Sequence, residues 1–340
     1  MDECGAPVVE YGLVSVIVPV FNRPAQLQSA VASILSQDYR PVEVIIVDDG
    51  SDDGCTPEVA ETMAAANPGV VRVIRIPNSG PGYAREQGRL AARGEFIQYL
   101  DSDDVLLPGK FSVQVAALRT RPDANVAYGI TVLRDARGQL VAGPHKDTAV
   151  PRAHMFPTFL NSRWWDTGTP LYRAIVCSVA GPWTDLRLEE DWEYDCRVAK
   201  AGGILVHCPV PVSETREHSG DRLGHGSAYD ASRLAMRAVS HRLVWGHAKQ
   251  AGLPATAPAE VSRFARSLFL LARQCGAVGL VREAADLHSA ATEAAANDPV
   301  VLRQLRVYRA TARLLGWRGP GRLAQMADAV RDSLRSARHG

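Results

Sequence analysis

The chain has 340 residues, of which 46% are hydrophobic and 22% charged, and its formal net charge is +1 at pH 7. This length predicts two domains, or one large domain with an appendage, and the near-neutral charge gives no indication of a nucleic-acid partner. The acidic start lacks the basic and apolar regions of a signal peptide, and no apolar run is long enough to span a membrane. We therefore expect a cytoplasmic protein, with peripheral membrane attachment left open.

Strand-like and helix-like segments alternate along the first hundred residues. The apolar runs of strand type are Val14–Val20, Val42–Val47, Val70–Ile76 and Glu95–Leu100. Segments with helical spacing of apolar residues separate them at 27–35, 57–66 and 82–92. Unbroken apolar runs are typical of strands that are covered on both faces. The order predicts βαβ units in an α/β fold, with a mostly parallel sheet flanked by helices.

The composition changes beyond about residue 227, where strand-like runs stop and Ala, Leu and Arg recur with helical periodicity. We therefore predict an α/β domain at residues 10–225 and an α-helical domain at residues 226–340. Residues 261–298 resemble a single tetratricopeptide-type helix pair, and one unit is too few for a solenoid.

The last forty residues are strongly basic, with Asp328 and Asp332 as their acidic residues. Their arginines are Arg303, Arg306, Arg309, Arg313, Arg318, Arg322, Arg331, Arg335 and Arg338. A basic amphipathic surface of this kind suits anionic lipid or an acidic partner. A solvated helix face is the alternative.

Three aspartates, Asp101, Asp103 and Asp104, occupy four positions directly after the apolar run FIQYL. Adjacent negative charges repel one another, so the arrangement is costly without a partner. Ligands of parallel sheets bind beyond the carboxyl ends of the strands. There, carboxylates one residue apart suit Mg²⁺ or Mn²⁺ together with a sugar hydroxyl. Capping and turn formation would explain one of the three aspartates, and we expect Asp104 to begin the following helix.

Five motifs occur in a fixed order along the chain. They are VSVIVPVFNR (Val14–Arg23), VIIVDDGSDD (Val44–Asp53), NSGPGYAREQG (Asn78–Gly88), GEFIQYLDSDD (Gly94–Asp104) and LEEDWEYDCRVAKAG (Leu188–Gly202). In order and spacing they resemble the inverting glycosyltransferases of family 2, which have the GT-A fold. The resemblance covers about two thirds of the chain and leaves the C-terminal helical region outside.

The resemblance implies roles for residues within these motifs. The residues implied to bind the nucleotide or the donor sugar are Pro19, Phe21, Asn22, Arg23, Asp49, Arg85, Asp101 and Ser102. Of these, Pro19 and Phe21 would line the base pocket, and Asp49 would hydrogen-bond the nucleobase. In the DxD element, Asp103 would ligate Mn²⁺ or Mg²⁺. His218 in TREHSG is a second candidate ligand, with a solvated loop histidine as the alternative.

On the acceptor side, the resemblance implies that Asp191 in the EED segment is the general base. Glu190 beside it would shape the acceptor pocket. Trp164 and Trp165 lie in the segment where the family builds its acceptor wall. Paired tryptophans can stack on a sugar ring or belong to the core, and this choice stays open.

Together these features predict an enzyme: a metal-dependent, inverting glycosyltransferase that moves a sugar from a nucleotide diphosphate, most often UDP, to an acceptor hydroxyl. The cation would neutralise the leaving diphosphate, and Asp191 would deprotonate the acceptor. Glycan, lipid-linked, small-molecule and peptide acceptors stay open, as do a homodimer or membrane contact through the C-terminal helices.

Two alternatives to this prediction remain. One is a sugar nucleotidyltransferase, against which the glycine-free loop PVFNRPAQLQ counts. The other is a catalytically degenerate scaffold that binds a nucleotide sugar, against which the presence of Asp103 and Asp191 counts.

Overall fold

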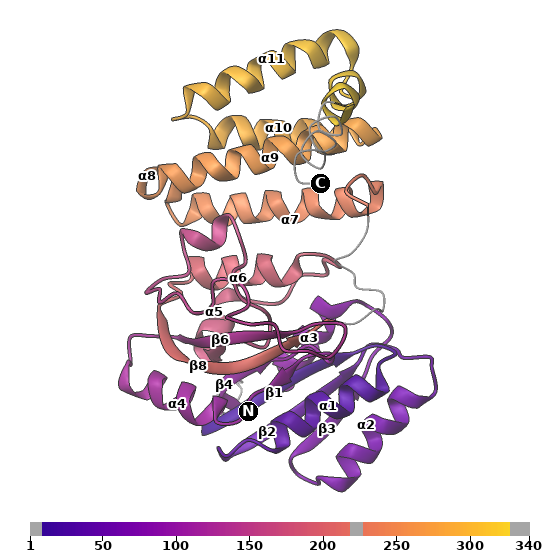
Figure 1. The fold of residues 1–340 in the computed structure, drawn as a ribbon, viewed down its shortest axis with the longest axis vertical. Helices are drawn as coiled ribbons and strands as arrows, with labels where there is room; N and C mark the ends of the chain where they lie inside the picture. Colours follow the sequence, from indigo (N-terminus) through magenta and orange to yellow (C-terminus); the bar gives the residue numbers. More distant parts are fainter. Residues whose placement is uncertain (1–8, 218–226, 327–340) are drawn as a thin grey trace, which may run out of the picture. The chain divides into compact units, whose positions relative to one another are not determined.

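The computed structural model describes residues 9–217 and 227–326, and the chain divides into two compact units (Figure 1). Unit 1 comprises residues 1–156 and 163–220. Unit 2 comprises residues 157–162 and 221–340. The segment 157–162 therefore belongs with the C-terminal helices although it lies within the first part of the sequence. His218, Arg331, Arg335 and Arg338, which the sequence analysis singled out, lie outside the described residues.

Unit 1 begins with the predicted alternation of strands and helices. Its first elements are β1 (Glu10–Val20), α1 (Pro24–Leu35), β2 (Val42–Asp48), α2 (Cys55–Ala66), β3 (Val71–Arg75), α3 (Pro81–Ala91) and β4 (Gly94–Tyr99). The elements that follow are β5 (Val105–Leu106), α4 (Lys110–Thr120), β6 (Val126–Arg134), β7 (Leu171–Arg173), α5 (Ala174–Ala180), α6 (Glu190–Lys200) and β8 (Leu205–Arg216).

Within the described residues, the strands form one eight-stranded sheet in the order β3-β2-β1-β4-β7-β6-β8-β5. β1 pairs in parallel with β2 and β4, and β2 pairs in parallel with β3. The predicted parallel sheet is confirmed for these strands. The short strands β5 and β7 run antiparallel to their neighbours and make the sheet mixed. Their two or three residues are too few for a periodicity to be recognised in the sequence.

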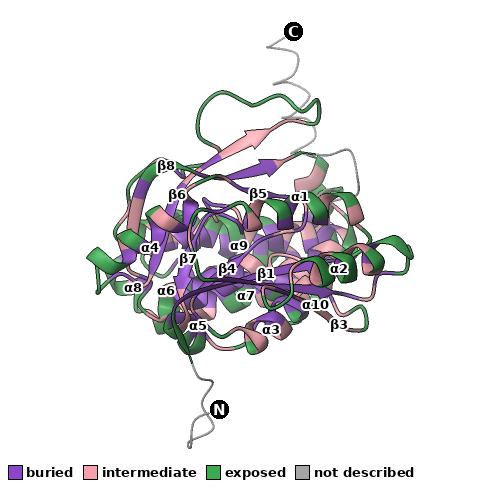
Figure 2. Cartoon of the chain, turned by 90° about the horizontal axis from the view of Figure 1, so that it is seen from below, coloured by how far each residue is buried: buried purple, intermediate pink, exposed green. Residues whose placement is uncertain are grey.

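Both faces of β1 are buried, which explains its unbroken apolar sequence (Figure 2). Val14, Val16 and Val18 contribute to a core with residues of α1, α2 and α4. Ile17 points to the opposite face, toward α3. A Cβ added at Gly88 of α3 would lie 2.3 Å from the Ile17 side chain, so this glycine permits the close approach of helix and strand.

Unit 2 is helical throughout its described residues. It contains α7 (Ala231–Gln250), α8 (Leu253–Thr256), α9 (Pro258–Val278), α10 (Val281–Ala294) and α11 (Pro299–Leu315), together with the short helix η1 (Thr158–Leu160). α9 and α10 pack together and form the helix pair expected from the sequence. Asn161 next to η1 donates to the Glu260 carbonyl at 3.0 Å, which ties its segment to α9. No helix among the described residues has both the length and the apolar character needed to cross a membrane.

Candidate active site

The aspartates of the DSDD loop, between β4 and β5, have separate partners. The Asp103 carboxylate accepts a hydrogen bond from Arg23 at 2.5 Å. The Asp101 carboxylate accepts one from Arg85 at 2.6 Å. Two guanidinium groups from other elements thus offset the charge of the first two carboxylates, whereas Asp104 is held differently.

Asp104 is buried and fastens the DSDD loop to β8. Its carboxylate accepts hydrogen bonds from the backbone N–H of Arg216 at 3.1 Å and from the Thr215 hydroxyl at 3.3 Å. Burial, with the nearby charges of Asp103 and Asp101, raises the pKa of Asp104 well above its usual range. The expectation that Asp104 begins a helix is wrong, because strand β5 follows it directly.

Arg85 on α3 joins the DSDD loop to α6. Its guanidinium donates to Asp101 at 2.6 Å and to Glu190 at 2.7 Å, and it lies 5.0 Å from the ring centre of Trp183. Burial works to raise the pKa of Asp101, but the charge and hydrogen bond of Arg85, together with the charge of Arg163, lower that pKa overall. Burial and the neighbouring Asp191 raise the pKa of Glu190 in spite of Arg85. The DSDD loop and the acidic start of α6 therefore both contact the buried guanidinium group of Arg85.

The loops after β1 and β2 are tied together at the same edge of the sheet. Asn22 has a left-handed backbone (φ 53°), and its side-chain amide exchanges hydrogen bonds with Asp52 at 2.7 and 3.0 Å. Its backbone N–H donates to the Ser51 hydroxyl at 3.0 Å. Pro19 is buried at the end of β1, whereas Phe21 is 42% exposed. Phe21 is thus the more accessible of the two residues expected to line a base pocket.

Asp49 is buried at the end of β2 and holds the loop that precedes α3. One carboxylate oxygen accepts from the backbone N–H of Ser79 at 2.7 Å, and the other accepts from that of Gly80 at 2.9 Å. A carboxylate oxygen has a second lone pair, so a base contact by Asp49 stays a prediction. Ser102, also expected to bind the donor, is buried within the DSDD loop.

Asp191 lies in the first turn of α6, and 28% of its side chain is exposed. One carboxylate oxygen lies 2.8 Å from the Arg163 guanidinium. The other accepts from the backbone N–H of Trp192 at 2.7 Å. The N-terminal end of a helix favours negative charge. Asp191 is therefore accessible and held at both oxygens.

Asp195 also holds Arg163, at its Nε atom, whereas Asp191 contacts Nη1. Asp195 is 1% exposed, and it accepts hydrogen bonds from Arg163 Nε at 2.8 Å, Trp165 Nε1 at 2.8 Å and the Tyr172 hydroxyl at 2.6 Å. Burial works to lower the pKa of Arg163, but the carboxylates of Asp191 and Asp195 outweigh it and raise that pKa. Neither Arg163 nor Asp195 was among the site residues predicted from the sequence. The four-residue spacing from Asp191 to Asp195, which places them on one helix face, is the signal for Asp195.

Trp164 and Trp165 are 3% and 0% exposed. The Trp164 ring lies 5.1 Å from the Tyr128 ring and 5.0 Å from the Arg152 guanidinium. Trp165 donates to Asp195. Protein atoms cover both indoles, which favours the core alternative of the two that the sequence left open.

Asp101 and Asp103 supply the hard oxygen atoms that Mg²⁺ and Mn²⁺ prefer. Their side chains are 33% and 14% exposed. Within residues 9–217 and 227–326, no group of three or more His, Cys, Asp or Glu side chains is arranged to hold a metal ion. The donor atoms fit a cation of the magnesium kind, which commonly takes one or two protein carboxylates and completes its shell with substrate phosphates and water.

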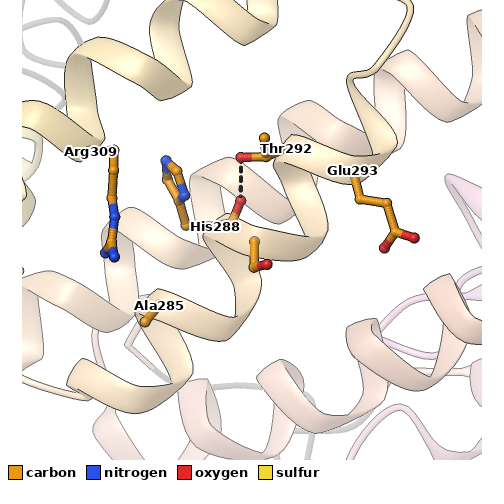
Figure 3. Close-up of a pocket in the computed structure, with 6 residues that line it drawn as sticks. Ala285, His288, Thr292, Glu293 and Arg309 are labelled. Carbon is orange, nitrogen blue, oxygen red and sulfur yellow. Dashed lines mark hydrogen bonds between the residues drawn. The ribbon is translucent and has the colours of Figure 1, made fainter.

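A separate cavity of about 450 Å³ lies in unit 2 (Figure 3). It is lined by Ala285, His288, Ser289, Thr292, Glu293 and Arg309. Burial lowers the pKa of His288, and His288 Nε2 lies 3.0 Å from the Leu305 carbonyl oxygen. None of the residues predicted for the active site lines this cavity, so it is distinct from the acidic site of unit 1.

The chain is similar to known proteins in sequence and in fold. A family model described as Glycosyl transferase family 2 matches residues 15–174. An uncharacterized glycosyltransferase of Rickettsia felis is 32% identical over 141 residues, which cover 41% of this chain and 23% of that protein. The minor teichoic acid biosynthesis protein GgaA of Bacillus subtilis is 36% identical over 95 residues, which cover 26% of this chain and 21% of that protein. The matches thus span about a quarter of the length of these relatives.

Among solved structures, S. aureus TarS 1-349 superposes with a TM-score of 0.57 at 17% identity, covering 86% of this chain and 91% of that one. The mixed sheet, its flanking helices and the helical C-terminal region define a GT-A fold with a helical appendage. The sequence likeness to glycosyl transferase family 2 covers residues 15–174. That match includes the DSDD loop and ends before Asp191 and α6.

Proposed function

We propose that this chain is an inverting, metal-dependent glycosyltransferase that transfers a sugar from a nucleotide diphosphate to an acceptor hydroxyl. The observation that carries the proposal is the position of Arg85, which contacts Asp101 at 2.6 Å and Glu190 at 2.7 Å. It joins the loop expected to bind the donor to the helix that carries the expected base. A donor sugar and an acceptor would meet where these two motifs meet.

The donor would bind at the carboxyl edge of the sheet, as ligands of parallel α/β sheets generally do. Phe21 and Asp49, at the ends of β1 and β2, would contact the base. Asp103 would hold a divalent cation that, when bound, neutralises charge on the diphosphate, and Asp101 would approach the ribose or the donor sugar. TarS 1-349 has been crystallised with UDP-GlcNAc and with UDP, which supports a uridine nucleotide as the donor.

Asp191 would act as the base that removes the proton from the acceptor hydroxyl. Its accessible carboxylate is held by Arg163 and by the backbone N–H of Trp192, so its orientation is fixed before the acceptor arrives. Fixed orientation contributes to rate because a positioned base need not be ordered during the reaction. Attack on the face of the sugar opposite the diphosphate inverts the anomeric centre.

The test begins with thermal unfolding of the full chain in the presence of UDP, GDP, dTDP, CMP and their common sugars, each with Mn²⁺, Mg²⁺ or EDTA. A ligand at a hundredfold excess over its dissociation constant stabilises the folded state by about 2.7 kcal/mol. We expect a metal-dependent shift with one nucleotide family. Glycan, lipid-linked, small-molecule and peptide acceptors are then screened for inverted product.

Two variants make the assignment of the base specific. Asp191→Asn should abolish transfer and leave the thermal shift with nucleotide in place, because it removes proton acceptance and keeps the shape of the side chain. Asp185→Asn, at an exposed position in the segment before α6, is the matched control and should behave as wild type. Normal turnover by Asp191→Asn would refute the role of Asp191. If no nucleotide raises the unfolding temperature of the folded protein, donor binding is refuted.

A further inference from the structure

The end of the described chain carries charge of a single sign. Residues 299–326, which include α11, contain six arginines and no aspartate or glutamate. All six are exposed: Arg303, Arg306, Arg309, Arg313, Arg318 and Arg322. By contrast, α10 contains three carboxylates and one arginine. The positive charge is therefore concentrated at one end of unit 2.

Helix α11 has an exposed apolar stripe beside these arginines. Its buried residues, Val301, Leu305, Tyr308 and Ala312, lie on one side, and the helix packs against α9 and α10 (Figure 1). Val300, Val307 and Leu314 lie on the other side and are 61%, 62% and 84% exposed. A seven-residue spacing is close to two helical turns, so the three aliphatic side chains form a line along the outside of the helix.

Arg303, Arg306 and Arg313 also lie on the exposed side of the helix, about 40° to 120° around the axis from this line at 3.6 residues per turn. We call the line and these arginines together the outer face of α11. In the described parts of the chain, none of these three arginines forms an ion pair with a carboxylate. In the same unit, Arg242 and Lys249 of α7 pair with carboxylates of α10 at 2.7 and 3.0 Å. As far as the described residues go, the outer face of α11 thus combines positive charge that no carboxylate pairs with and exposed aliphatic surface.

We propose that the outer face of α11 docks on an anionic lipid surface. In an interfacial helix the apolar side chains enter the boundary of the acyl chains, while arginines remain at the level of the lipid phosphates. A second copy of this chain would bring like charges together. A soluble polyanion would pair with the arginines and leave Val307 and Leu314 in water. A bilayer with acidic headgroups offers negative charge to the arginines and an apolar interior to the aliphatic side chains at the same time.

The test measures binding of the full chain to vesicles by co-sedimentation. One set of vesicles is phosphatidylcholine alone, and the other contains phosphatidylglycerol as well. Each basic residue near an anionic membrane contributes about a fivefold gain in binding. The triple variant Arg303→Gln, Arg306→Gln, Arg313→Gln should therefore bind the anionic vesicles on the order of a hundredfold less tightly. Added salt should weaken binding of the wild type in the same direction.

A second variant separates lipid from other occupants. Val307→Ser with Leu314→Ser should weaken vesicle binding and leave binding to soluble polyglutamate unchanged, because only a bilayer accepts the aliphatic side chains. The matched control is Val281→Ser with Arg282→Gln, an exposed apolar–basic pair at the start of α10, which should bind vesicles as the wild type does. Circular dichroism verifies that all variants are folded.

Three results would overturn the proposal. The first is that the wild type binds neutral and anionic vesicles equally well, or binds neither kind. The second is undiminished vesicle binding by the triple arginine variant. The third is lipid-free self-association, seen by sedimentation velocity, that the Val307→Ser, Leu314→Ser variant abolishes, since this would assign the face to a second copy of the chain.

Discussion

Replacing Asp195 with asparagine tests the network that holds the candidate base. The carboxylate of Asp195 accepts hydrogen bonds from Arg163, Trp165 and Tyr172 at 2.8, 2.8 and 2.6 Å. An asparagine offers one acceptor oxygen, and its NH₂ group would face a donor. The substitution therefore leaves at least one buried donor unpaired and halves the negative charge around Arg163.

The magnitude follows from the burial of these groups. Removing one partner of a buried ion pair typically costs about 3–5 kcal/mol. Domains have a total stability of about 5–15 kcal/mol, so Asp195→Asn should remain folded at low temperature and unfold at a clearly lower urea concentration. Its kcat should fall further than its donor affinity, because a looser Arg163 leaves Asp191 less well oriented.

The assay is urea unfolding followed by both tryptophan fluorescence and circular dichroism. Two probes are needed because the chain has two compact units, and unfolding in more than one step would invalidate a single free energy. Steady-state kinetics with varied donor and acceptor then separate kcat from KM. A loss of stability below about 1 kcal/mol, the size of one ordinary hydrogen bond, would refute the network. An unchanged kcat in the folded variant would refute its link to Asp191.

Three further substitutions probe packing and charge. Lys110 is fully buried and donates to the Thr169 carbonyl at 2.8 Å, and burial lowers its pKa well below the usual range. A lysine whose pKa is lowered by folding destabilises the folded state at pH values below its unfolded-state pKa, and Gln114 also donates to the Thr169 carbonyl at 3.0 Å. Lys110→Met should therefore raise the stability at neutral pH, measured by urea unfolding, and a loss of stability would contradict this. Arg134 binds Glu214 through two hydrogen bonds of 2.9 and 2.6 Å and is the main cause of its lowered pKa. A lowered carboxyl pKa stabilises the fold above the unfolded-state value of about 4.3. Glu214→Gln should consequently lose about 1.5–3 kcal/mol at pH 7. Its deficit should begin to shrink below the unfolded-state pKa and disappear as the pH falls through the lowered pKa of Glu214, as a pH series of melts would reveal. Gly88→Ala should cost about 1–3 kcal/mol through overpacking against β1, and an unchanged melting temperature would count against that contact.

Local sequence patterns predicted the first part of unit 1 well. The runs VSVIVPV and VEVIIV are buried on both faces, and this constraint is visible in each strand separately. The DSDD loop was also placed correctly, because strand ends in a parallel sheet meet at one edge. The helical character of unit 2 followed from its periodicity in the same way.

Pairings between distant residues could not be predicted in this manner. Arg163 lies in a segment without regular periodicity, and its contacts with Asp191 and Asp195 depend on tertiary packing. The partner of Asp103 is Arg23, eighty positions earlier. The short strands β5 and β7 likewise form because they pair with neighbouring strands, and no sequence pattern within them predicts a strand.

The DSDD loop is fastened to the sheet at both ends. β4 pairs with β1 before it, and β5 pairs with β8 after it, with Val105 opposite Glu214. One inserted residue would shift β5 by one position and turn its two side chains to the opposite faces. Chains related to this one are therefore expected to keep the length of this loop constant, and to accept insertions at the exposed turn between residues 135 and 138. Invariant length, more than invariant composition, would then identify the loop that positions the carboxylates.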